Sequence, residues 1–458
     1  MDIEAKIGLF NNKKIALLGL GEENLALLEF LVSCGVKNIT VCDKKGRKEP
    51  GTLNHKFKDI PINWILGEGY LENLNQFEII FRTPGIPYLH EKIQEAQKMG
   101  VEISSQTKLF FKLCPCPIIG VTGTKGKGTT TALIGEILKK AGKDVYIGGN
   151  IGQPPIDFID KLTKDNIVVL ELSSFQLQDI DRSPHIAVVL DIKVDHLDIH
   201  KNEAEYIEAK RNIIKYQKKD DFAVINADYY TSIEFAASTE AKVFWFSRRK
   251  SVDMGAFILR NEIILKTEEK EIILANKKDL KLRGEHNLEN ILAAVISGYF
   301  GGANLESIKK TIEEFKGLEH RLELVKEIDG IKFYNDSFST TPETTIAAIK
   351  SFSEPIILLV GGSEKRSDYS NLAMAIKEST VKSIISIGLT SKRIVESIAD
   401  NKIDVVDNIQ NLNQAVKISK EKAKPGDVVL LSPASASFDR FKNYKERGKI
   451  FKEEVLSL

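Results

Sequence analysis

Gly120-Val-Thr-Gly-Thr-Lys-Gly-Lys-Gly-Thr-Thr-Thr-Ala-Leu133 is the stretch that decides the fold of this 458-residue chain. The apolar run Pro117-Ile-Ile119 precedes it, and apolar positions at Leu133, Ile137 and Leu138 follow. This order predicts a buried strand, a glycine-rich loop and a helix. The backbone N–H groups of such a loop and the positive end of the helix together favour a bound phosphate. The alternative is a glycine-rich turn that holds no ligand.

The residues expected to surround a phosphate lie in the middle of this stretch. They are Gly123, Thr124, Lys125, Gly126, Lys127, Gly128, Thr129 and Thr130. Lys127 is placed to reach the terminal phosphates. Gly128 follows Lys127 at the position where a standard P-loop has Ser or Thr. The hydroxyl that holds magnesium would therefore come from Thr129 or from elsewhere.

The composition is that of an ordinary globular protein, with 42% hydrophobic and 28% charged residues. The length suggests about two to four domains. A net charge of +1 gives no argument for nucleic acid or a membrane as a partner. Four cysteines in so long a chain fit a reducing compartment. No apolar run approaches about 18 residues, so the sequence does not support a membrane span. We expect a cytoplasmic monomer whose partners are small molecules, with neither nucleic acid nor a membrane among them.

Three blocks of the chain each alternate strand-like and helix-like patterns, and they predict domains at 1–113, 114–317 and 318–458. Strands are predicted within 14–21, 38–43, 77–81, 117–119, 166–172, 186–190, 331–334, 355–362, 383–387 and 427–432. The stretch 243–282 indicates a small antiparallel region, and 285–299 a helix. Such alternation predicts a doubly wound α/β fold with a mostly parallel sheet.

Two candidate metal ligands follow predicted strands of the second block. Glu171 ends a very apolar strand, where a carboxylate can hold magnesium near the phosphates. A helix-capping acid is the alternative for Glu171. His196 lies in the acidic loop 191–200, and from composition alone a metal ligand and a solvated histidine are equally open. Lys210 lies on an amphipathic helix, where composition alone predicts a solvated side chain.

Gly19-Leu-Gly21 follows the first strand, and Asp43 ends the next one, as in a dinucleotide fingerprint. Asn24 stands where the third glycine of that pattern belongs. The incomplete motif favours nucleotide contact of some kind over NAD in particular. A tight turn without a ligand is the alternative, since glycine alone permits such a turn.

Several short segments, in family order and over nearly the whole chain, resemble the Mur ligases. They are the glycine loop, Gly148-Gly-Asn-Ile-Gly152, Leu170-Glu-Leu-Ser-Ser-Phe-Gln-Leu177, Asp195-His-Leu-Asp198, Glu208-Ala-Lys210, Gly284-Glu-His-Asn287, His320-Arg321, Asn335-Asp-Ser337 and Leu431-Ser-Pro-Ala-Ser-Ala-Ser-Phe-Asp-Arg-Phe-Lys-Asn-Tyr444. The third and the last of these segments resemble most the members that add D-glutamate.

The resemblance implies a Rossmann-like UDP-binding domain, a central P-loop ATPase domain and a C-terminal Rossmann-like domain. The implied reaction joins D-glutamate to UDP-N-acetylmuramoyl-L-alanine through an acyl-phosphate, with ATP and two magnesium ions. The process served would be cytoplasmic synthesis of peptidoglycan precursors, and with it cell shape and division. A related folylpolyglutamate-type ligase, an NAD-binding oxidoreductase and a catalytically silent nucleotide-binding regulator are the alternatives.

The resemblance also implies roles for individual residues. Lys127, Glu171, His196 and Lys210 would be catalytic, and Lys210 would be carbamylated. The metal ligands would be Thr129, Glu171, His196 and the carbamate of Lys210. ATP contacts beyond the loop would come from Asn287, Asn290, Arg321 and Asp336. The UDP substrate would meet Leu20, Gly21, Glu22, Asp43, Lys44, Thr83, Gly85, Asn150, Ser173 and Gln176. The amino acid would meet Thr340, Lys365, Ser437 and Tyr444. Phe338 stands where the family usually has a lysine.

Overall fold

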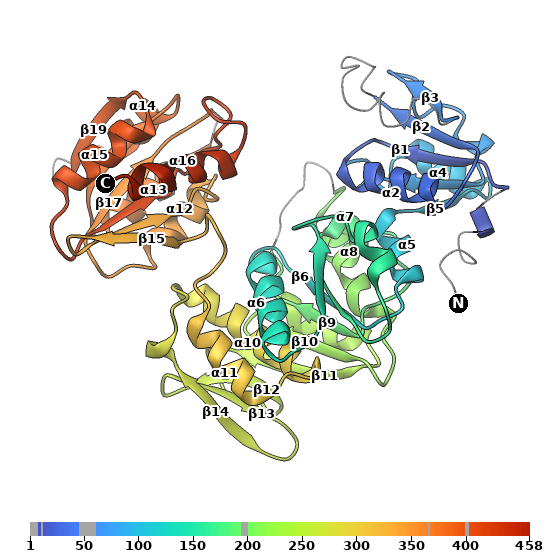
Figure 1. Ribbon diagram of the computed structural model, residues 1–458, viewed down its shortest axis with the longest axis horizontal. Coiled ribbons are helices and arrows are strands. Elements are labelled where there is room, and N and C mark those ends of the chain that lie inside the picture. Colours follow the sequence, from blue (N-terminus) through green and yellow to red (C-terminus); the bar gives the residue numbers. More distant parts are fainter. Residues whose placement is uncertain (1–7, 11, 45–60, 194–199, 365–366, 399–402) are drawn as a thin grey trace. The chain divides into compact units, whose positions relative to one another are not determined.

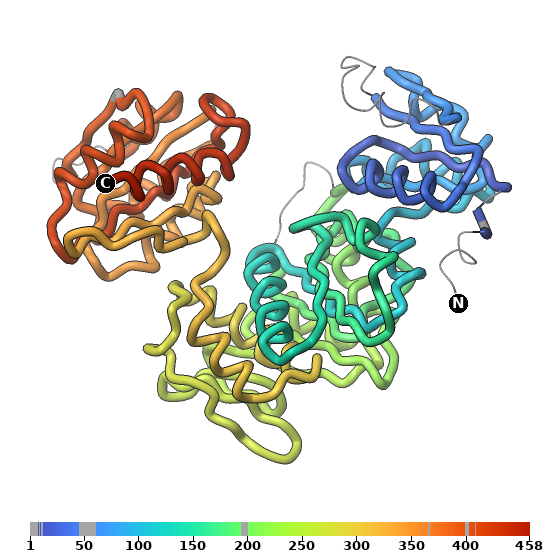
Figure 2. The backbone as a smooth tube through the Cα atoms, in the orientation of Figure 1, coloured from blue at the N-terminus to red at the C-terminus, as the bar shows by residue number. Residues whose placement is uncertain are grey.

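The computed structural model describes residues 8–10, 12–44, 61–193, 200–364, 367–398 and 403–458. The described chain forms two compact units, which are treated separately below (Figure 1). The first consists of 1–279 and 289–312, and the second of 280–288 and 313–458. Figure 2 traces the same path, with most of the second unit in orange to red.

The first unit begins with a parallel sheet of strand order β3-β2-β1-β4-β5. Its strands are β1 (Ile15–Leu18), β2 (Ile39–Asp43), β3 (Asn63–Leu66), β4 (Ile79–Arg82) and β5 (Glu102–Ser104). The accompanying helices are η1 (Gly8–Phe10), α2 (Glu22–Ser33), η2 (Leu74–Gln76), α4 (Glu91–Lys98) and α5 (Gln106–Leu113). Strands β1 and β4 are buried along their whole length, as expected when helices cover both faces of a parallel sheet.

A second sheet in this unit has the order β14-β13-β12-β11-β10-β9-β6-β8-β7. Its strands are β6 (Ile118–Thr122), β7 (Val145–Gly149), β8 (Ile167–Glu171), β9 (Ile186–Val189), β10 (Phe222–Asn226), β11 (Lys242–Ser247), β12 (Gly255–Leu259), β13 (Glu262–Lys266) and β14 (Glu271–Asn276). Helical segments are α6 (Lys127–Lys140), η3 (Pro155–Lys161), α7 (Ser174–Leu177), α8 (Glu203–Lys215), α9 (Tyr230–Ile233), η4 (Glu234–Ser238), η5 (Lys277–Asp279), α10 (Glu285–Phe300) and α11 (Leu305–Glu314).

The second unit is built on a sheet of order β15-β16-β20-β17-β18-β19. Its strands are β15 (Glu323–Ile328), β16 (Ile331–Asn335), β17 (Ile356–Val360), β18 (Val381–Ile387), β19 (Asp404–Ile409) and β20 (Val428–Leu431). Its helices are α12 (Pro342–Ile349), α13 (Ser370–Lys377), α14 (Ser391–Ile398), α15 (Leu412–Lys422) and α16 (Tyr444–Leu456). Strand β15 pairs antiparallel with β16, whereas the pairs from β16 to β19 are parallel.

These three mostly parallel sheets confirm the predicted α/β fold, and the strands expected from apolar runs are present. The region 243–282 was expected to be antiparallel, and this holds only in part. Strands β12 to β14 are antiparallel, but β11 pairs parallel with both β10 and β12. The alternating pattern of this stretch reflects burial on one face, which does not fix strand direction. The domain borders at 113 and 317 remain predictions. No helix among the described residues is long and apolar enough to cross a membrane.

Candidate active site

The glycine loop joins the carboxyl end of β6 to the start of α6. Gly123 and Gly126 adopt φ angles of +155° and +86°, which side chains other than hydrogen disfavour. A Cβ atom on Gly126 would lie 2.3 Å from Oδ1 of Asn290, and one on Gly123 would lie 2.7 Å from Cβ of Leu190. Both glycines are therefore required by backbone geometry and by close packing. The predicted strand, loop and helix are confirmed.

Lys127 folds back over this loop. Its Nζ donates hydrogen bonds to the carbonyl oxygens of Gly123 at 3.0 Å and Thr124 at 3.1 Å. The ammonium group thus lies above the loop, at the start of helix α6, where a phosphate would be favoured. Lys125 is exposed, whereas Gly128, Thr129 and Thr130 are buried. The Thr130 hydroxyl donates to Oδ1 of Asn290 at 3.2 Å.

Glu171 lies at the end of β8, next to β6 in the sheet, and its side chain is buried. Its Oε1 accepts a hydrogen bond of 2.8 Å from Nδ2 of Asn150. Its Oε2 is buried without a hydrogen-bond partner in the described part of the chain. A buried carboxylate oxygen without a partner is costly unless a cation or a donor from a ligand completes it.

Asp191 follows β9, the other neighbour of β6, and was missed as a site residue by the sequence prediction. Its Oδ1 is likewise buried and has no hydrogen-bond partner among the described residues, while its Oδ2 pairs with Nζ of Lys193 at 2.7 Å. Its backbone carbonyl accepts from the N–H of Thr124 at 2.7 Å, which ties it to the loop. The signal that pointed to Glu171, an acid directly after an apolar strand, also applies to Asp191.

Lys210 is buried, so the prediction of a solvated side chain, which composition alone gave, is wrong. Its side chain is only 2% exposed, not solvated. Its Nζ donates to the carbonyl oxygen of Gly123 at 3.0 Å and lies 4.7 Å from the ring centroid of Tyr206. The Tyr206 hydroxyl is 3.0 Å from Oγ1 of Thr124. Helix α8 therefore places a buried amine against the glycine loop, because one of its faces packs on the sheet.

The donor set around the loop fits a magnesium ion. Glu171 and Asp191 offer carboxylate oxygens, and Thr129 offers a hydroxyl, which are the ligand types that Mg²⁺ prefers. The unpartnered oxygens of Glu171 and Asp191 are the observation that supports this fit. His196 lies outside the described residues.

The loop after β1 has the features of a nucleotide-binding turn. Gly19 has a φ of +76°, and a Cβ atom there would lie 2.5 Å from Cγ2 of Thr83. Oδ2 of Asp43 accepts from the N–H of Leu20 at 2.6 Å, so this acid holds the turn itself. Nδ2 of Asn24 donates to the carbonyls of Leu18, Gly19 and Phe81 at 3.0, 2.8 and 3.1 Å. Asn24 therefore fastens the turn from inside, which explains an asparagine at the place of the third glycine.

The other residues predicted for the UDP site differ in how exposed they are. Glu22, Lys44, Gly85 and Asn150 are exposed, Leu20 and Thr83 are half-buried, and Gly21 is the N-cap residue of α2. Gln176 is buried, and both ends of its amide are engaged by protein groups. Its Oε1 accepts from the backbone N–H and the hydroxyl of Ser173, and its Nε2 donates to Glu23 at 2.6 Å.

The predicted ATP contacts Asn287, Arg321 and Asp336 lie in the second unit. The guanidinium carbon of Arg321 lies 3.6 Å from the ring centroid of Phe338, a close stacking contact. Both carboxylate oxygens of Asp336 accept from protein groups, the N–H of Leu322 at 3.2 Å and the hydroxyl of Ser432 at 2.8 Å. Burial raises the pKa of Asp336 to about 6.

The candidate amino-acid site also belongs to the second unit. Ser437 is buried, Thr340 and Tyr444 are half-buried, and Lys365 lies outside the described residues. The ring of Tyr444 meets Phe338 edge-on at 5.1 Å. Arg447 is buried and ties two family segments together. It donates to the hydroxyl and carbonyl of Ser337 and to the carbonyls of Ser435 and Ala436.

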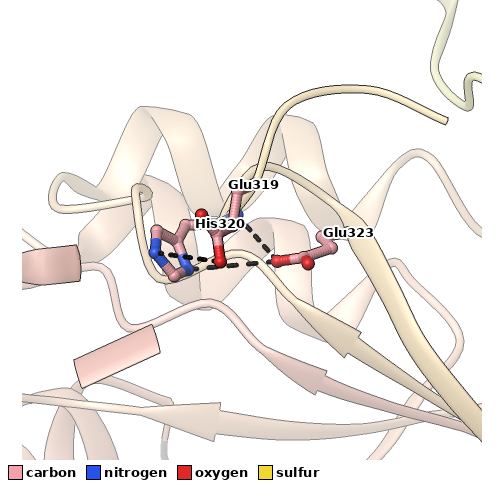
Figure 3. Close-up of side chains that lie close together, drawn as sticks. All are labelled: Glu319, His320 and Glu323. Carbon is pink, nitrogen blue, oxygen red and sulfur yellow. Dashed lines mark hydrogen bonds and ion pairs between the residues drawn. The ribbon is translucent and has the colours of Figure 1, made fainter. Parts of the chain in front are cut away.

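Glu319, His320 and Glu323 form a cluster of possible metal ligands at the start of the second unit (Figure 3). Both carboxylates are already paired within the protein, because Nζ of Lys452 bonds Glu319 at 2.8 Å and Glu323 at 2.5 Å. Nδ2 of Asn335 contacts Nδ1 of His320 at 2.8 Å. Burial lowers the pKa of His320, which favours the neutral ring. The cluster is an internal ion-pair network.

Comparison with known proteins agrees with this arrangement. The family description "Mur ligase MurD-like, N-terminal domain" matches residues 13–105, "Mur ligase middle domain" matches 121–298, and "Mur ligase, glutamate ligase domain" matches 320–435. The chain belongs to the Mur ligase family.

Within that family, the chain resembles the members that carry D-glutamate in their names. A UDP-N-acetylmuramoylalanine--D-glutamate ligase of Symbiobacterium thermophilum is 41% identical over 456 residues, which cover 98% of this chain and 99% of the relative. A protein of the same name from Acetivibrio thermocellus is 41% identical over 464 residues, which cover 100% of this chain and 98% of the relative.

Solved structures agree on the fold. The MurF ligase of Thermotoga maritima in complex with ADP superposes with a TM-score of 0.59 at 17% identity, covering 100% of both chains. The UDP-N-acetylmuramate-alanine ligase MurC of the same organism has a TM-score of 0.59 at 18% identity, covering 97% of this chain and 100% of that one. At such low identity the likeness concerns the fold alone.

Proposed function

We propose that this chain is an ATP-dependent ligase that adds D-glutamate to UDP-N-acetylmuramoyl-L-alanine in peptidoglycan precursor synthesis. The observation that carries the proposal is the buried, unpartnered carboxylate oxygen of Glu171 beside the glycine loop. The full-length similarity to ligases of that name supports the choice of substrates. The cytoplasmic location, the monomeric state and the three domain borders belong to the proposal as well.

The residues around the glycine loop would hold ATP and magnesium. Loop N–H groups and Lys127 would bind the phosphates, with Asn287, Asn290, Arg321 and Asp336 completing the nucleotide site. Glu171 and Thr129 would hold one magnesium ion, with Asp191 as a further ligand, and His196 a second ion. Magnesium would supply positive charge at the phosphate oxygens where negative charge develops.

The reaction would proceed in two steps. The terminal carboxylate of the muramoyl-alanine substrate attacks the γ-phosphorus, the bond to the β-phosphate oxygen breaks, and ADP leaves. The amine of D-glutamate then attacks the acyl-phosphate carbonyl, and inorganic phosphate and a proton leave as the amide forms. Lys127 stabilises the transferring phosphoryl group by its charge.

Lys210 would act as a carbamate. Its amine would add to CO2 with loss of a proton, which replaces a cation by an anion. The resulting carboxylate would lie beside the glycine loop, where it would be a ligand for magnesium and would orient the acyl-phosphate.

The two substrates would meet separate sets of residues. Leu20, Gly21, Glu22, Asp43, Lys44, Thr83 and Gly85 would hold the UDP group, and Asn150, Ser173 and Gln176 the muramoyl-alanine part. Thr340, Lys365, Ser437 and Tyr444 would bind the incoming amino acid.

The test is release of ADP and phosphate by the purified protein in a matrix of UDP-muramoyl precursors and amino acids. We expect turnover that requires both UDP-N-acetylmuramoyl-L-alanine and D-glutamate. Turnover with another amino acid and none with D-glutamate would contradict the substrate assignment. Intact ATP binding without turnover under any combination would favour a nucleotide-binding regulator instead.

A further inference from the structure

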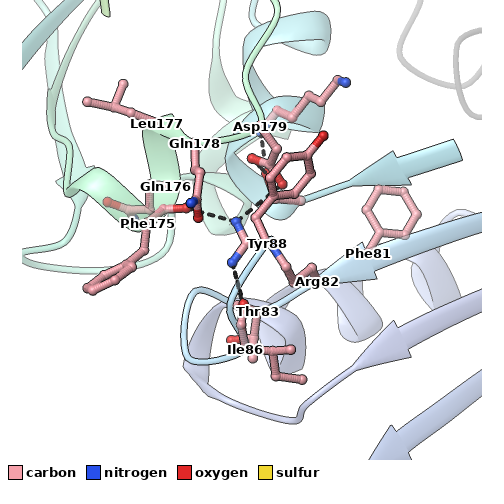
Figure 4. Close-up of polar contacts among 12 residues, drawn as sticks. Phe81, Arg82, Thr83, Ile86, Tyr88, Phe175, Gln176, Leu177, Gln178 and Asp179 are labelled. Carbon is pink, nitrogen blue, oxygen red and sulfur yellow. Dashed lines mark hydrogen bonds and ion pairs between the residues drawn. The ribbon is translucent and has the colours of Figure 1, made fainter. Parts of the chain in front are cut away.

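Arg82 is a fully buried arginine that the proposed chemistry does not use. It ends β4 directly before the Thr83-Pro-Gly85 turn, and its side chain is 0% exposed. Its Nη1 donates to the carbonyl of Ile86 at 2.7 Å and to that of Thr83 at 3.3 Å. One half of the guanidinium group therefore closes the candidate UDP turn from inside (Figure 4).

The other half of the same guanidinium group contacts the segment that follows strand β8 of the second sheet. Nη2 donates to the carbonyl of Phe175 at 2.9 Å and to Oδ2 of Asp179 at 3.4 Å. Oδ1 of Asp179 accepts from the hydroxyl of Ser105 at 3.0 Å, just before helix α5. Figure 4 shows Arg82 pointing from its strand toward the short helix that carries Phe175 to Leu177. Because the arginine fork is planar and rigid, it fixes both partners at once.

A second, partly buried hydrogen bond connects the same two parts of the first unit. Glu23, in the first turn of α2, accepts from Nε2 of Gln176 at 2.6 Å. Gln176 in turn accepts from Ser173, two residues after Glu171. The loops assigned to UDP and the segment that begins with Glu171 are thus joined within the first unit at one buried and one partly buried place.

We infer that Arg82 and Asp179 are positioning residues that fix the distance between the Thr83-Pro-Gly85 turn and Glu171. The protein would thereby select substrates by the distance between their UDP group and their reacting carboxylate. This inference rests on the proposed function. A substrate whose carboxylate falls short of Glu171 would still bind through its UDP group but would not be phosphorylated. Small displacements of reacting groups are enough to lower the rate steeply.

The test compares Asp179→Ala, which removes both bonds of that carboxylate, with the conservative Asp179→Asn. UDP-N-acetylmuramoyl-L-alanine and the shorter UDP-N-acetylmuramate are each used as phosphoryl acceptors, and UDP binding is measured by calorimetry. We expect Asp179→Ala to lower kcat for the full-length substrate about tenfold to a hundredfold, with UDP affinity unchanged. The preference for the longer substrate should fall as well. Asp179→Asn should restore most of kcat and most of that preference.

Asp181→Ala is the matched control, because Asp181 makes an exposed ion pair with Lys108 only two residues further on. It should leave kcat and preference unchanged. If Asp179→Ala does not fold, Arg82→Lys replaces it, since lysine keeps the charge but not the fork. A folded variant with wild-type kcat and preference would overturn the inference. Absence of wild-type turnover on UDP-N-acetylmuramoyl-L-alanine would instead contradict the proposed function.

Discussion

Nζ of Lys210 lies 3.0 Å from the carbonyl oxygen of Gly123, although 87 residues separate them in the chain. The contact joins helix α8 to the loop that begins α6. It places a buried amine at the edge of the candidate phosphate site, where a charge can act on a ligand with little screening by water.

Replacement of Lys210 by alanine should nearly abolish ligation. The loop would lose its buried amine, and with it the carbamate that we propose. A short-chain carboxylic acid added to the assay should restore part of the ADP release, since it supplies the missing carboxylate. Lys215→Ala, at the exposed end of the same helix, should keep normal activity. Full activity of Lys210→Ala without added acid would rule out the carbamate role.

Asn150→Ala should weaken the binding of magnesium and leave the stability of the protein unchanged. Asn150 orients Glu171 through a 2.8 Å hydrogen bond, and loss of such an outer ligand contact costs about tenfold to a hundredfold in metal affinity. A titration of ADP release against Mg²⁺ should therefore shift its midpoint upward by at least about tenfold. An unchanged midpoint would mean that Glu171 does not hold the ion. Removal of Mg²⁺ by a chelator should stop turnover in the wild type.

Glu23→Gln should stabilise the protein at high pH and not at low pH. Burial raises the pKa of Glu23 from 4.5 to about 7, and the charge of Asp179 adds to the rise, whereas Gln176 and the charge of Arg82 oppose it. Because the folded state binds this proton more tightly, the stabilisation is complete below pH 4.5 and is lost as the pH rises through about 7. Neutral glutamine does not undergo that loss, so the variant should gain at most about 3 kcal/mol in free energy of unfolding at high pH.

Thermal melting of the wild type and Glu23→Gln across pH 5 to 8 would check this. The difference in Tm between the two proteins should be small at about pH 5 and should grow in favour of the variant toward about pH 8. A difference that does not change with pH would show that Glu23 titrates normally. Glu22→Gln, at the neighbouring exposed position, should show no such trend.

Phe338→Leu should weaken nucleotide binding. The ring of Phe338 carries the guanidinium group of Arg321 at 3.6 Å, and a stacked pair of this kind contributes about 1 kcal/mol. Loss of the ring should free Arg321 and reduce the affinity for ADP about fivefold, as measured by calorimetry. Phe438→Leu is the control, because Phe438 is 70% exposed. If both variants and the wild type bind ADP with equal affinity, Arg321 does not contribute to nucleotide binding.

The sequence by itself determined the local parts of this protein. Apolar runs predicted strands such as β6 and β8, and the glycines around Lys127 predicted the loop, because these features depend on neighbours in the chain. The acid after β8 was predicted for the same reason. Composition could not distinguish Lys210 from a solvated lysine, since the amphipathic pattern of helix α8 does not say what its buried face meets.

Only the tertiary structure decided which distant groups come together. The order of strands places β8 and β9 on either side of β6, so that Glu171 and Asp191 flank one loop. The same folding buries Arg82 between a turn of the first sheet and Asp179, 97 residues away. Sequence periodicity fixes elements, because it reflects local burial. Contacts between elements depend on how the sheets are ordered and packed, which no single stretch of sequence contains.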